Sequence, residues 1–334
     1  MRIYNLLFCI CLLAFASCKT SRHTVTYEYI KAAEYELPRY ARSILIVNNT
    51  ARQSPFDGHT IQYGEVKRKL YQPLDSLNRT LISDLAFMMD ETKRFDKVLF
   101  DSVSLRTDTL YLNKRELALA DVNALARNNN VDLVLVLDRS AMMSDLRIGA
   151  FDKSNFMQFL NTVRYQTDFK LYDSLVGDYI HDVNGNKEWQ LESITQNEDL
   201  GFFETSLTRN QGMILWEKED QIMRSLFPYM QSENRFLFST LDSNMKDAYN
   251  YARRNNWDDA AIIWEYLFQN MTDLQLKKYC ALNMAHYYER KNNLQEALAW
   301  LNKSGENQTN QDEILTKYIA DFTKSLKERI GLRQ

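Results

Sequence analysis

The stretch Val131-Asp-Leu-Val-Leu-Val-Leu137 carries the clearest buried-strand pattern in the chain. Apart from one aspartate it is a continuous run of valine and leucine, which favours a strand covered on both faces of a sheet. Asn128-Asn-Asn130 comes directly before it, and asparagine tolerates the left-handed conformation found at helix ends. The sequence therefore predicts a helix that ends at these asparagines and leads into a central strand.

The residues before this strand predict two more strands, with a helix after each. Ser43-Ile-Leu-Ile-Val47 and Lys97-Val-Leu-Phe100 are short apolar runs of the kind that form strands. After each run, apolar residues recur at the three-to-four-residue spacing of an amphipathic helix. These positions are Leu74, Leu77, Leu81, Leu85 and Met88 in the first helix and Leu117, Ala120, Ala124 and Leu125 in the second. The alternating order predicts an α/β layer.

The residues after the central strand predict an antiparallel meander. From Val163 to Leu171, every second residue is suited to a buried position. This two-residue period is typical of a half-buried strand. Two further strand segments, Tyr179-Ile180 and Trp189–Leu191, flank Asn184-Gly-Asn186, and Asn-Gly is a strong hairpin signal. We therefore expect residues 37–200 to form an α/β (or α+β) domain with a mixed sheet of three to five strands.

This order of elements resembles a small α/β domain of periplasmic proteins, such as the N-terminal domain of TolB and the curli-secretion lipoproteins. The segments that carry the resemblance are Ser43–Val47, Lys93-Arg-Phe95, Asn130–Leu135 and Phe169-Lys-Leu-Tyr-Asp173. It covers residues 40–195. Because those domains mostly contact other proteins, the resemblance implies a binding role, although a fold alone does not transfer a function.

A pattern repeats itself within residues 243–305. The first copy has Ala248, Tyr251, Ala260 and Trp264, and the second has Ala285, Tyr288, Ala297 and Leu301, an offset of 37 residues. An asparagine pair precedes the second helix of each copy, at Asn255-Asn256 and Asn292-Asn293. The alanines let paired helices approach closely, and the large residues fill the space beside them. The pattern resembles two tetratricopeptide repeats, whose usual period is 34 residues, and it predicts an all-α domain packed through these eight residues.

Two segments flank these repeats. Residues 306–334 are expected to form a capping helix, with Ile314, Tyr318, Phe322, Leu326 and Ile330 along one face. Residues 201–242 are expected to form a helical connector. Because two repeats are fewer than are usually needed for stability, we expect the aromatic stretch Trp216–Leu241 to pack against the first repeat and join it to the α/β domain.

Residues 1–17 have the features of a cleaved signal peptide. Arg2 is followed by an apolar run, Ile3–Phe15, which is too short to cross a bilayer. The following Ala16-Ser17-Cys18 resembles the processing site of bacterial lipoproteins, which makes Cys18 the predicted lipid anchor and residues 18–36 a tether. The next residues, Lys19–Arg22, lack the acidic run that resembles a surface-export signal. We therefore expect the protein on the outer membrane, facing the periplasm.

The lipoprotein signal, the α/β domain and the helical pair together resemble a lipoprotein family of Bacteroidetes-type bacteria, a domain-of-unknown-function family. Three segments carry this resemblance: Phe169–Asp173, Arg224-Ser-Leu-Phe-Pro-Tyr229, and Asn255–Ala261 with Trp264. The family implies no assigned activity, so the resemblance supports the architecture rather than a role.

The composition and the candidate reactive residues predict no reaction. The net charge of −3 gives no reason to expect nucleic-acid binding. If Cys9 and Cys11 leave with the signal peptide and Cys18 is acylated, Cys280 is the one remaining thiol, and its helical, apolar surroundings favour a packing role. None of His23, His59, His181 and His286 has the spacing that places two metal ligands on one helical face. We therefore predict no catalytic residue, cofactor or metal.

Two arrangements of acidic and amide residues remain open to other interpretations. Asp182, Asn184 and Asn186 alternate as in a calcium loop, but Lys187 and Ser193 stand where such a loop needs glycine and glutamate, so the hairpin explains them better. Asp132 and Asp138 flank the central strand, and converging carboxylates there would support a hydrolase.

The leading functional hypothesis is a membrane-anchored, non-catalytic scaffold that binds an envelope protein or peptide through its helical repeats, which can present a concave face. One alternative is a purely structural lipoprotein whose repeats expose no binding groove. The other is a carboxylate-dependent envelope hydrolase. A groove on the repeats or a cleft with two close carboxylates would discriminate among the three.

Overall fold

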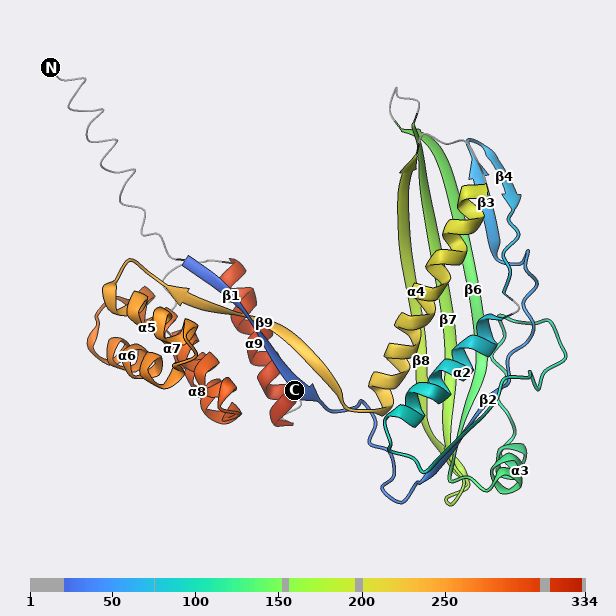
Figure 1. Cartoon of the computed structure of the whole chain (residues 1–334), viewed down its shortest axis with the longest axis horizontal. Helices are drawn as coiled ribbons and strands as arrows, with labels where there is room; N and C mark the ends of the chain where they lie inside the picture. The colour runs from blue at the N-terminus through green and yellow to red at the C-terminus, as the bar shows by residue number, and fades with distance from the viewer. Residues whose placement is uncertain (1–20, 75, 152–155, 196–200, 307–312, 332–334) are drawn as a thin grey trace. The chain divides into compact units, whose positions relative to one another are not determined.

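The computed structural model describes residues 21–331 except 75, 152–155, 196–200 and 307–312 (Figure 1). The chain forms two compact units. One unit, which we call the α/β unit, comprises residues 32–229. The other, the helical unit, comprises residues 230–334 together with the segment up to Lys31. Cys18, the predicted lipid anchor, lies outside the described residues.

The α/β unit is built on a seven-stranded mixed sheet. Its strands are β2 (Ser43–Asn48), β3 (His59–Tyr63), β4 (Val66–Lys69), β5 (Lys97–Asp101), β6 (Leu133–Phe151), β7 (Phe156–Asp173) and β8 (Asp178–Thr195). Strand β2 runs parallel to both β5 and β6, and β3 runs parallel to a later part of β6. The antiparallel pairs β6–β7 and β7–β8 complete the sheet. The mixed sheet is confirmed, but it has more strands than predicted.

Helices cover both faces of the parallel part of the sheet, as its apolar sequence predicts. Alternate residues of β6 point to opposite faces, so Leu133, Leu135 and Leu137 join one core cluster while Val134 and Val136 join another. Helices α2 (Leu77–Glu91) and α4 (Gly201–Leu226) contribute to the first cluster, and α3 (Leu119–Asn129) contributes to the second (Figure 1). All five of these β6 side chains are 0% exposed, and each contributes roughly 1.5–3 kcal/mol on burial.

The turn chemistry was predicted correctly at one site and wrongly at another. Asn130 ends α3 in the left-handed conformation (φ 49°), as expected. Asn184–Asn186, however, lie inside β8 and pair with Asp168–Gln166 of β7. The hairpin turn falls instead after Asp173, whose Oδ1 accepts the backbone N–H of Leu175 at 2.9 Å.

Gly185 is explained by close packing rather than by a turn. A Cβ at this position would stand 2.8 Å from Lys218 Nζ and 3.0 Å from Thr167 Oγ1. A glycine inside a strand often marks such a close approach. The Asn184-Gly185 pair therefore does not mark a turn, and the glycine is explained by the close approach of Lys218 and Thr167.

The helical unit combines a two-stranded ribbon with five of the eight helices in the described residues. The ribbon pairs β1 (Ser21–Lys31) with β9 (Tyr229–Ser239). The helices are α5 (Ser243–Arg253), α6 (Trp257–Asn270), α7 (Leu274–Arg290), α8 (Leu294–Glu306) and α9 (Glu313–Ile330). Two predictions are corrected: the tether contains β1, and the helical connector is α4 followed by β9.

The aromatic stretch Trp216–Leu241 is divided between the two units. Phe227 lies in the core of the α/β unit, whereas Trp216 on α4 is 60% exposed. Phe236 and Phe238 lie on β9, where their rings stand 4.7 Å from Tyr318 and 4.9 Å from Tyr279, respectively. Only the β9 part of the stretch therefore packs with the helical unit. Among the described helices, none is long and apolar enough to cross a membrane.

Candidate binding sites

Seven of the eight predicted repeat residues are buried or half-buried in the helical unit. Ala248, Ala260, Ala285, Ala297 and Trp264 are 0% exposed, Leu301 is 1% exposed, and Tyr288 is half-buried. Tyr251 is 39% exposed, more than the other seven. The alanines bring α5 against α6 and α7 against α8, as expected from their small size.

The asparagine pairs make the same turn in both copies. The first asparagine of each pair is left-handed, with φ 63° at Asn255 and φ 56° at Asn292. The second donates its backbone N–H to the carbonyl of the repeat tyrosine, at 3.0 Å and 2.9 Å. Tyr251 therefore contributes its carbonyl oxygen to the turn, and its side chain is more exposed than that of Tyr288.

The face of α7 that could have lined a groove is covered by the chain's own β1–β9 ribbon. Asn283 on α7 pairs with the backbone of Phe238 on β9, donating to its carbonyl at 2.8 Å and accepting its N–H at 2.9 Å. Tyr27 on β1 donates its hydroxyl to the Glu289 carbonyl at 3.0 Å. The ribbon thus occupies the place that an extended peptide partner would take on such a face.

A buried ion-pair network fastens this ribbon to α7 and α9. Arg235 of β9 donates to both carboxylate oxygens of Glu289, at 2.8 and 2.9 Å, and Arg329 of α9 donates at 2.5 Å. Glu289 is 0% exposed. Burial alone raises the pKa of Glu289, but the neighbouring His286 and Arg235 outweigh it and hold the pKa below the ordinary glutamate value. The carboxylate therefore stays charged and paired.

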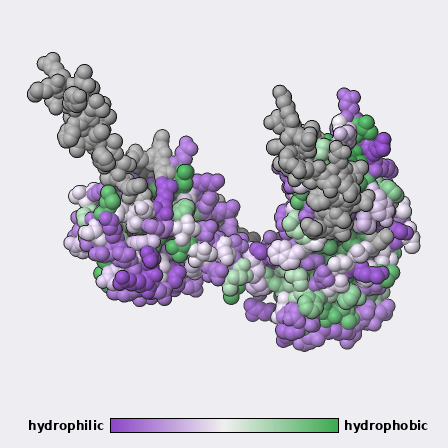
Figure 2. All heavy atoms as spheres, turned by 45° about the horizontal axis from the view of Figure 1, so that its top comes forward, coloured by the Kyte–Doolittle hydropathy of each residue, from purple (hydrophilic) through white to green (hydrophobic). Residues whose placement is uncertain are grey.

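The outer face of α6 remains open to solvent. Ile262 and Tyr266, one helical turn apart, are 65% and 58% exposed. At the start of the same helix, the guanidinium of Arg290 lies 4.4 Å from the Trp257 ring centroid. On the face seen in Figure 2 the helical unit is mainly hydrophilic. Ile30 and Met230 of the ribbon are also strongly exposed, at 72% and 59%.

The α/β unit contains a polar cavity of about 700 Å³, which we call the sheet-edge pocket. It lies beyond the carboxyl ends of β2 and β5, beside the first turn of α2. Its described lining residues are Asn48, Thr50, Ala51, Arg52, Gln53, Leu74, Leu77, Asn78, Arg79, Ser102, Val103, Ser104, Arg106, Thr107 and Ser140. Three are arginines, and none of those described is acidic.

Hydrogen-bonded neutral side chains connect three of the four segments that line this pocket. Ser140 of β6 donates to Asn78 Oδ1 of α2 at 2.5 Å, and Asn78 Nδ2 donates to Thr50 Oγ1 at 2.9 Å. Thr50 donates in turn to Asn48 Oδ1 at 2.8 Å. Asn48, Thr50 and Ser140 are each under 5% exposed. Sequence reasoning missed these residues because they come from separate elements and share no local motif.

The arginines of the sheet-edge pocket differ in how they are held. Arg106 donates to both carboxylate oxygens of Asp108, at 2.7 and 3.0 Å, and to the Asn113 carbonyl at 2.9 Å. This contact holds the pKa of Asp108 below its usual range. Arg79 is exposed and makes no hydrogen bond or ion pair within the part of the chain that the structure describes. Of the three lining arginines, Arg106 is therefore fixed, Arg52 also has an interaction partner, and Arg79 is available to a ligand.

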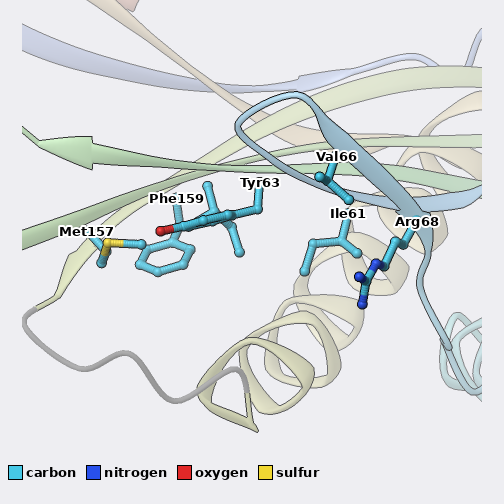
Figure 3. A pocket seen from close by; sticks show the side chains of 7 residues that line it. Ile61, Tyr63, Val66, Arg68, Met157 and Phe159 are labelled. Atoms are coloured by element: carbon cyan, nitrogen blue, oxygen red, sulfur yellow. The ribbon is translucent and has the colours of Figure 1, made fainter.

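A second hollow, of about 460 Å³, is mainly apolar (Figure 3). Ile61, Tyr63, Val66, Arg68, Ile148, Met157 and Phe159 line it, from β3, β4, β6 and β7. It continues a small core cluster of Leu146, Ile148 and Phe159. Arg68 is the one charged group among its described lining residues.

The carboxylates considered for hydrolysis are separated along the sheet. Asp132 Oδ2 accepts the backbone N–H groups of Arg42 at 2.7 Å and Ser43 at 2.9 Å, so it supports the start of β2. Asp138 is 0% exposed, accepts from Asn49 at 2.8 Å, and has a pKa raised to about 6 by burial. Six residues of strand place the two roughly 20 Å apart, so they do not form one site.

The remaining candidate residues are part of local packing. Burial lowers the pKa of His59 to about 4, and its Nδ1 lies 2.9 Å from Ser144 Oγ. His181 stacks on Tyr35 with ring centroids 5.0 Å apart. Burial raises the pKa of Cys280 to about 12, which disfavours the reactive thiolate. Within the described ranges, no three His, Cys, Asp or Glu side chains are placed to hold a metal ion.

Comparison with known families assigns the chain to a family. A model described as a domain of unknown function (DUF8603) matches residues 41–238, more than half of the 334 residues. The chain belongs to the DUF8603 family. The DUF8603 match contains all seven strands of the large sheet. A second model, also a domain of unknown function (DUF6340), matches residues 246–328, within the helical unit.

Several solved structures show weak similarity to the chain, among them the three that follow, and no curated protein matches it. One is a candidate homologue of neuraminyllactose-binding hemagglutinin from Helicobacter pylori, at 11% identity and TM-score 0.28, covering 58% of this chain and 87% of its own. An uncharacterised protein shares 16% identity at TM-score 0.25, covering 56% and 96%. Lipoprotein GNA1162 from Neisseria meningitidis shares 13% identity at TM-score 0.17, covering 52% and 96%.

Proposed function

We propose that this protein is a lipid-anchored protein of the bacterial outer membrane that faces the periplasm, binds another envelope protein and catalyses no reaction. The Arg2–Cys18 segment supports the anchor, because a short apolar run before a cysteine suits acylation and several acyl chains hold a protein firmly. The helical pairs with equivalent asparagine turns support a tetratricopeptide-like unit, and the combination of domains supports an origin in Bacteroidetes-type bacteria.

The observation that carries the binding proposal is the exposed pair Ile262 and Tyr266 on α6. Because the ribbon already covers α7, we place the partner surface on the outer face of α6 and not on the inner face of the repeats. Aromatic and arginine side chains are enriched at the energetic centres of protein interfaces. At the start of α6, the Arg290 guanidinium lies 4.4 Å from the Trp257 ring centroid. This pair adds an aromatic and an arginine side chain of the same kind.

In-cell photocrosslinking tests this surface. A photoreactive residue at position 266 should capture a specific envelope protein, and Ile262→Asp should abolish that capture. Ile314→Asp on α9 is a matched control because Ile314 is 66% exposed, against 65% for Ile262. Loss of capture only in Ile262→Asp supports the proposal. Equal capture by both variants would place the contact elsewhere.

The purely structural role is the second candidate, and the covered face of α7 favours it. If the repeats serve only to hold the β1–β9 ribbon, no position on α6 should crosslink to a defined partner. Cells carrying Ile262→Asp would then match the wild type in envelope integrity, while variants that unfold the helical unit would not.

A further inference from the structure

The sheet-edge pocket lies at the point where the direction of strand order reverses. The parallel strands stand in the order β3-β6-β2-β5. After β2 the chain first forms β3 on the far side of β6, then returns to β5 on the other side of β2, and only then forms β6. Helices α2 and α3, which directly precede β5 and β6, contribute to core clusters on opposite faces. In open α/β sheets, ligands bind beyond the carboxyl ends of the strands at such a switch point. The residues that follow β2 and β5 line the pocket there.

The lining of this pocket favours negative charge. Arg79 is available, Arg106 is held in place, and the described lining residues include no carboxylate. The first turn of α2 carries no acidic residue, and its Ser76 side chain makes no capping hydrogen bond. The Leu77 amide of that turn donates to the Leu74 carbonyl at 3.0 Å, which leaves the amides of Asn78 and Arg79 for a ligand. The helix dipole adds positive potential. Asp108 pairs with Arg106 and, outside the pocket, with Arg115, so the guanidinium of Arg79 and the helix end remain.

The neutral part of the lining suits a ligand that also carries hydroxyl groups. Ser102 and Thr107 add hydroxyls beside the rigid Asn48–Thr50–Asn78–Ser140 network. The volume of about 700 Å³ is much larger than a bare oxyanion needs, and it falls within the range of small-molecule sites. The ligand should therefore extend beyond its charged group.

We propose that the sheet-edge pocket binds a phosphate ester of a small polyhydroxyl molecule. Arg79 and the first-turn amides of α2 hold the phosphate, since planar guanidinium groups pair with phosphate oxygens in a bidentate way. The hydroxyl and amide side chains bind the rest of the ligand. This site belongs to the α/β unit and is independent of the α6 surface.

Isothermal titration of the complete mature chain tests the site with three probes: inorganic phosphate, glucose 6-phosphate and glucose. We expect phosphate to bind, glucose 6-phosphate to bind at least tenfold more tightly, and glucose not to bind. Arg79→Gln should weaken both phosphates at least tenfold. Arg68→Gln, an exposed arginine of β4 at the apolar hollow, is the matched control and should leave binding unchanged.

A second variant tests the site without removing Arg79, so that an indirect effect of the Arg79→Gln substitution can be recognised. Val103 lines the pocket and is 68% exposed, so Val103→Asp adds a negative charge without disturbing the core, and Val103→Asn is its neutral control. Val103→Asp should abolish phosphate binding while the unfolding midpoint stays unchanged. The proposal is overturned if no phosphate binds at millimolar concentration, if Arg79→Gln and Val103→Asp bind like the wild type, or if glucose binds as tightly as glucose 6-phosphate.

Discussion

One cluster of buried charged side chains in each unit shows two opposite ways of burying charge. In the helical unit, Glu289 is surrounded by Arg235 and Arg329, so its charge is matched. In the α/β unit, α4 buries Lys218 and Glu219 at 1% and 5% exposure. Among the described residues, Lys218 Nζ makes one long hydrogen bond, 3.4 Å to Gln221, and lies 6.0 and 5.9 Å from the ring centroids of Tyr165 and Trp189, while Glu219 Oε1 has no partner. A matched buried charge locks a structure in place, whereas an unmatched one makes the structure depend on protonation.

The largest effect is expected from breaking the matched network. Arg235→Met leaves the Glu289 carboxylate buried without its bidentate partner, and such a loss destabilises a protein by about 3–5 kcal/mol. Urea unfolding followed by hydrogen exchange in α7 measures the change. Lys291→Met removes a surface ion pair with Asp258 and should leave α7 unaffected. Equal effects of the two substitutions would contradict the assignment of Arg235 as a lock.

A smaller effect is expected where α4 approaches the sheet. Gly185→Ala would place a Cβ 2.8 Å from Lys218 Nζ, and such overpacking costs about 1–3 kcal/mol. Because the clash is with a side-chain tip, the cost should fall sharply in a Lys218→Ala background. A double-mutant cycle on urea midpoints measures this coupling. Additive effects would show that Gly185 is needed for another reason.

The unmatched charges on α4 predict that the stability of the α/β unit depends on pH in two ranges, an acidic limb and an alkaline limb of the stability curve. Burial, with a smaller contribution from Asp84, raises the pKa of Glu219 to about 7, so the folded state binds the extra proton and stability falls as pH rises from about 4.5 to 7. Burial, with help from Lys187, lowers the pKa of Lys218 to about 8, so stability rises again from pH 8 to about 10.5. Their joint contribution to α/β-unit stability is therefore lowest between pH 7 and 8.

Two substitutions separate these limbs. Glu219→Gln should flatten the acidic limb, and Lys218→Met should flatten the alkaline one, each by on the order of 2 kcal/mol across its pH window. Comparing each variant with the wild type removes the contributions of other groups in the unit, such as Asp138 and His59. Urea unfolding at several pH values provides the measurement. If the variants show the same pH dependence of stability as the wild type, the burial of Lys218 and Glu219 on α4 does not control that dependence.

The smallest effect is expected at the exposed repeat tyrosine. Tyr251→Ser should change stability by less than about 0.5 kcal/mol because surface substitutions away from special contacts usually do. Tyr288→Ser, at the equivalent but half-buried position, should cost more. Thermal unfolding of both variants makes the comparison. A larger loss of stability in Tyr251→Ser than in Tyr288→Ser would contradict our account of the two repeat copies.

Local patterns predicted the parts of the fold that depend on local physics. The Val131–Leu137 strand, the end of α3 at Asn130 and the buried repeat alanines follow from hydrophobic period and backbone preference. Strand β1 escaped prediction because its polar and aromatic residues alternate at only half-buried positions. It is stabilised by β9, more than 190 residues away in sequence.

The binding sites could not be predicted, since each depends on distant contacts. Asn48, Asn78 and Ser140 meet only after the α/β unit has folded, and no one of them is unusual in its own segment. The repeat pattern suggested a free groove because nothing in it shows that the chain's own ribbon covers α7. Gly185 likewise gave a turn signal that only the position of Lys218 explains.

Hydrogen exchange on the crosslinked complex, compared with the free protein, tests the proposed binding role most directly. The account predicts that the α6 segment around Ile262 and Tyr266 becomes protected, while α7 and the β1–β9 ribbon exchange as before. Faster exchange in the ribbon together with new protection on α7 would contradict it, because the partner would then have displaced the ribbon from the repeats.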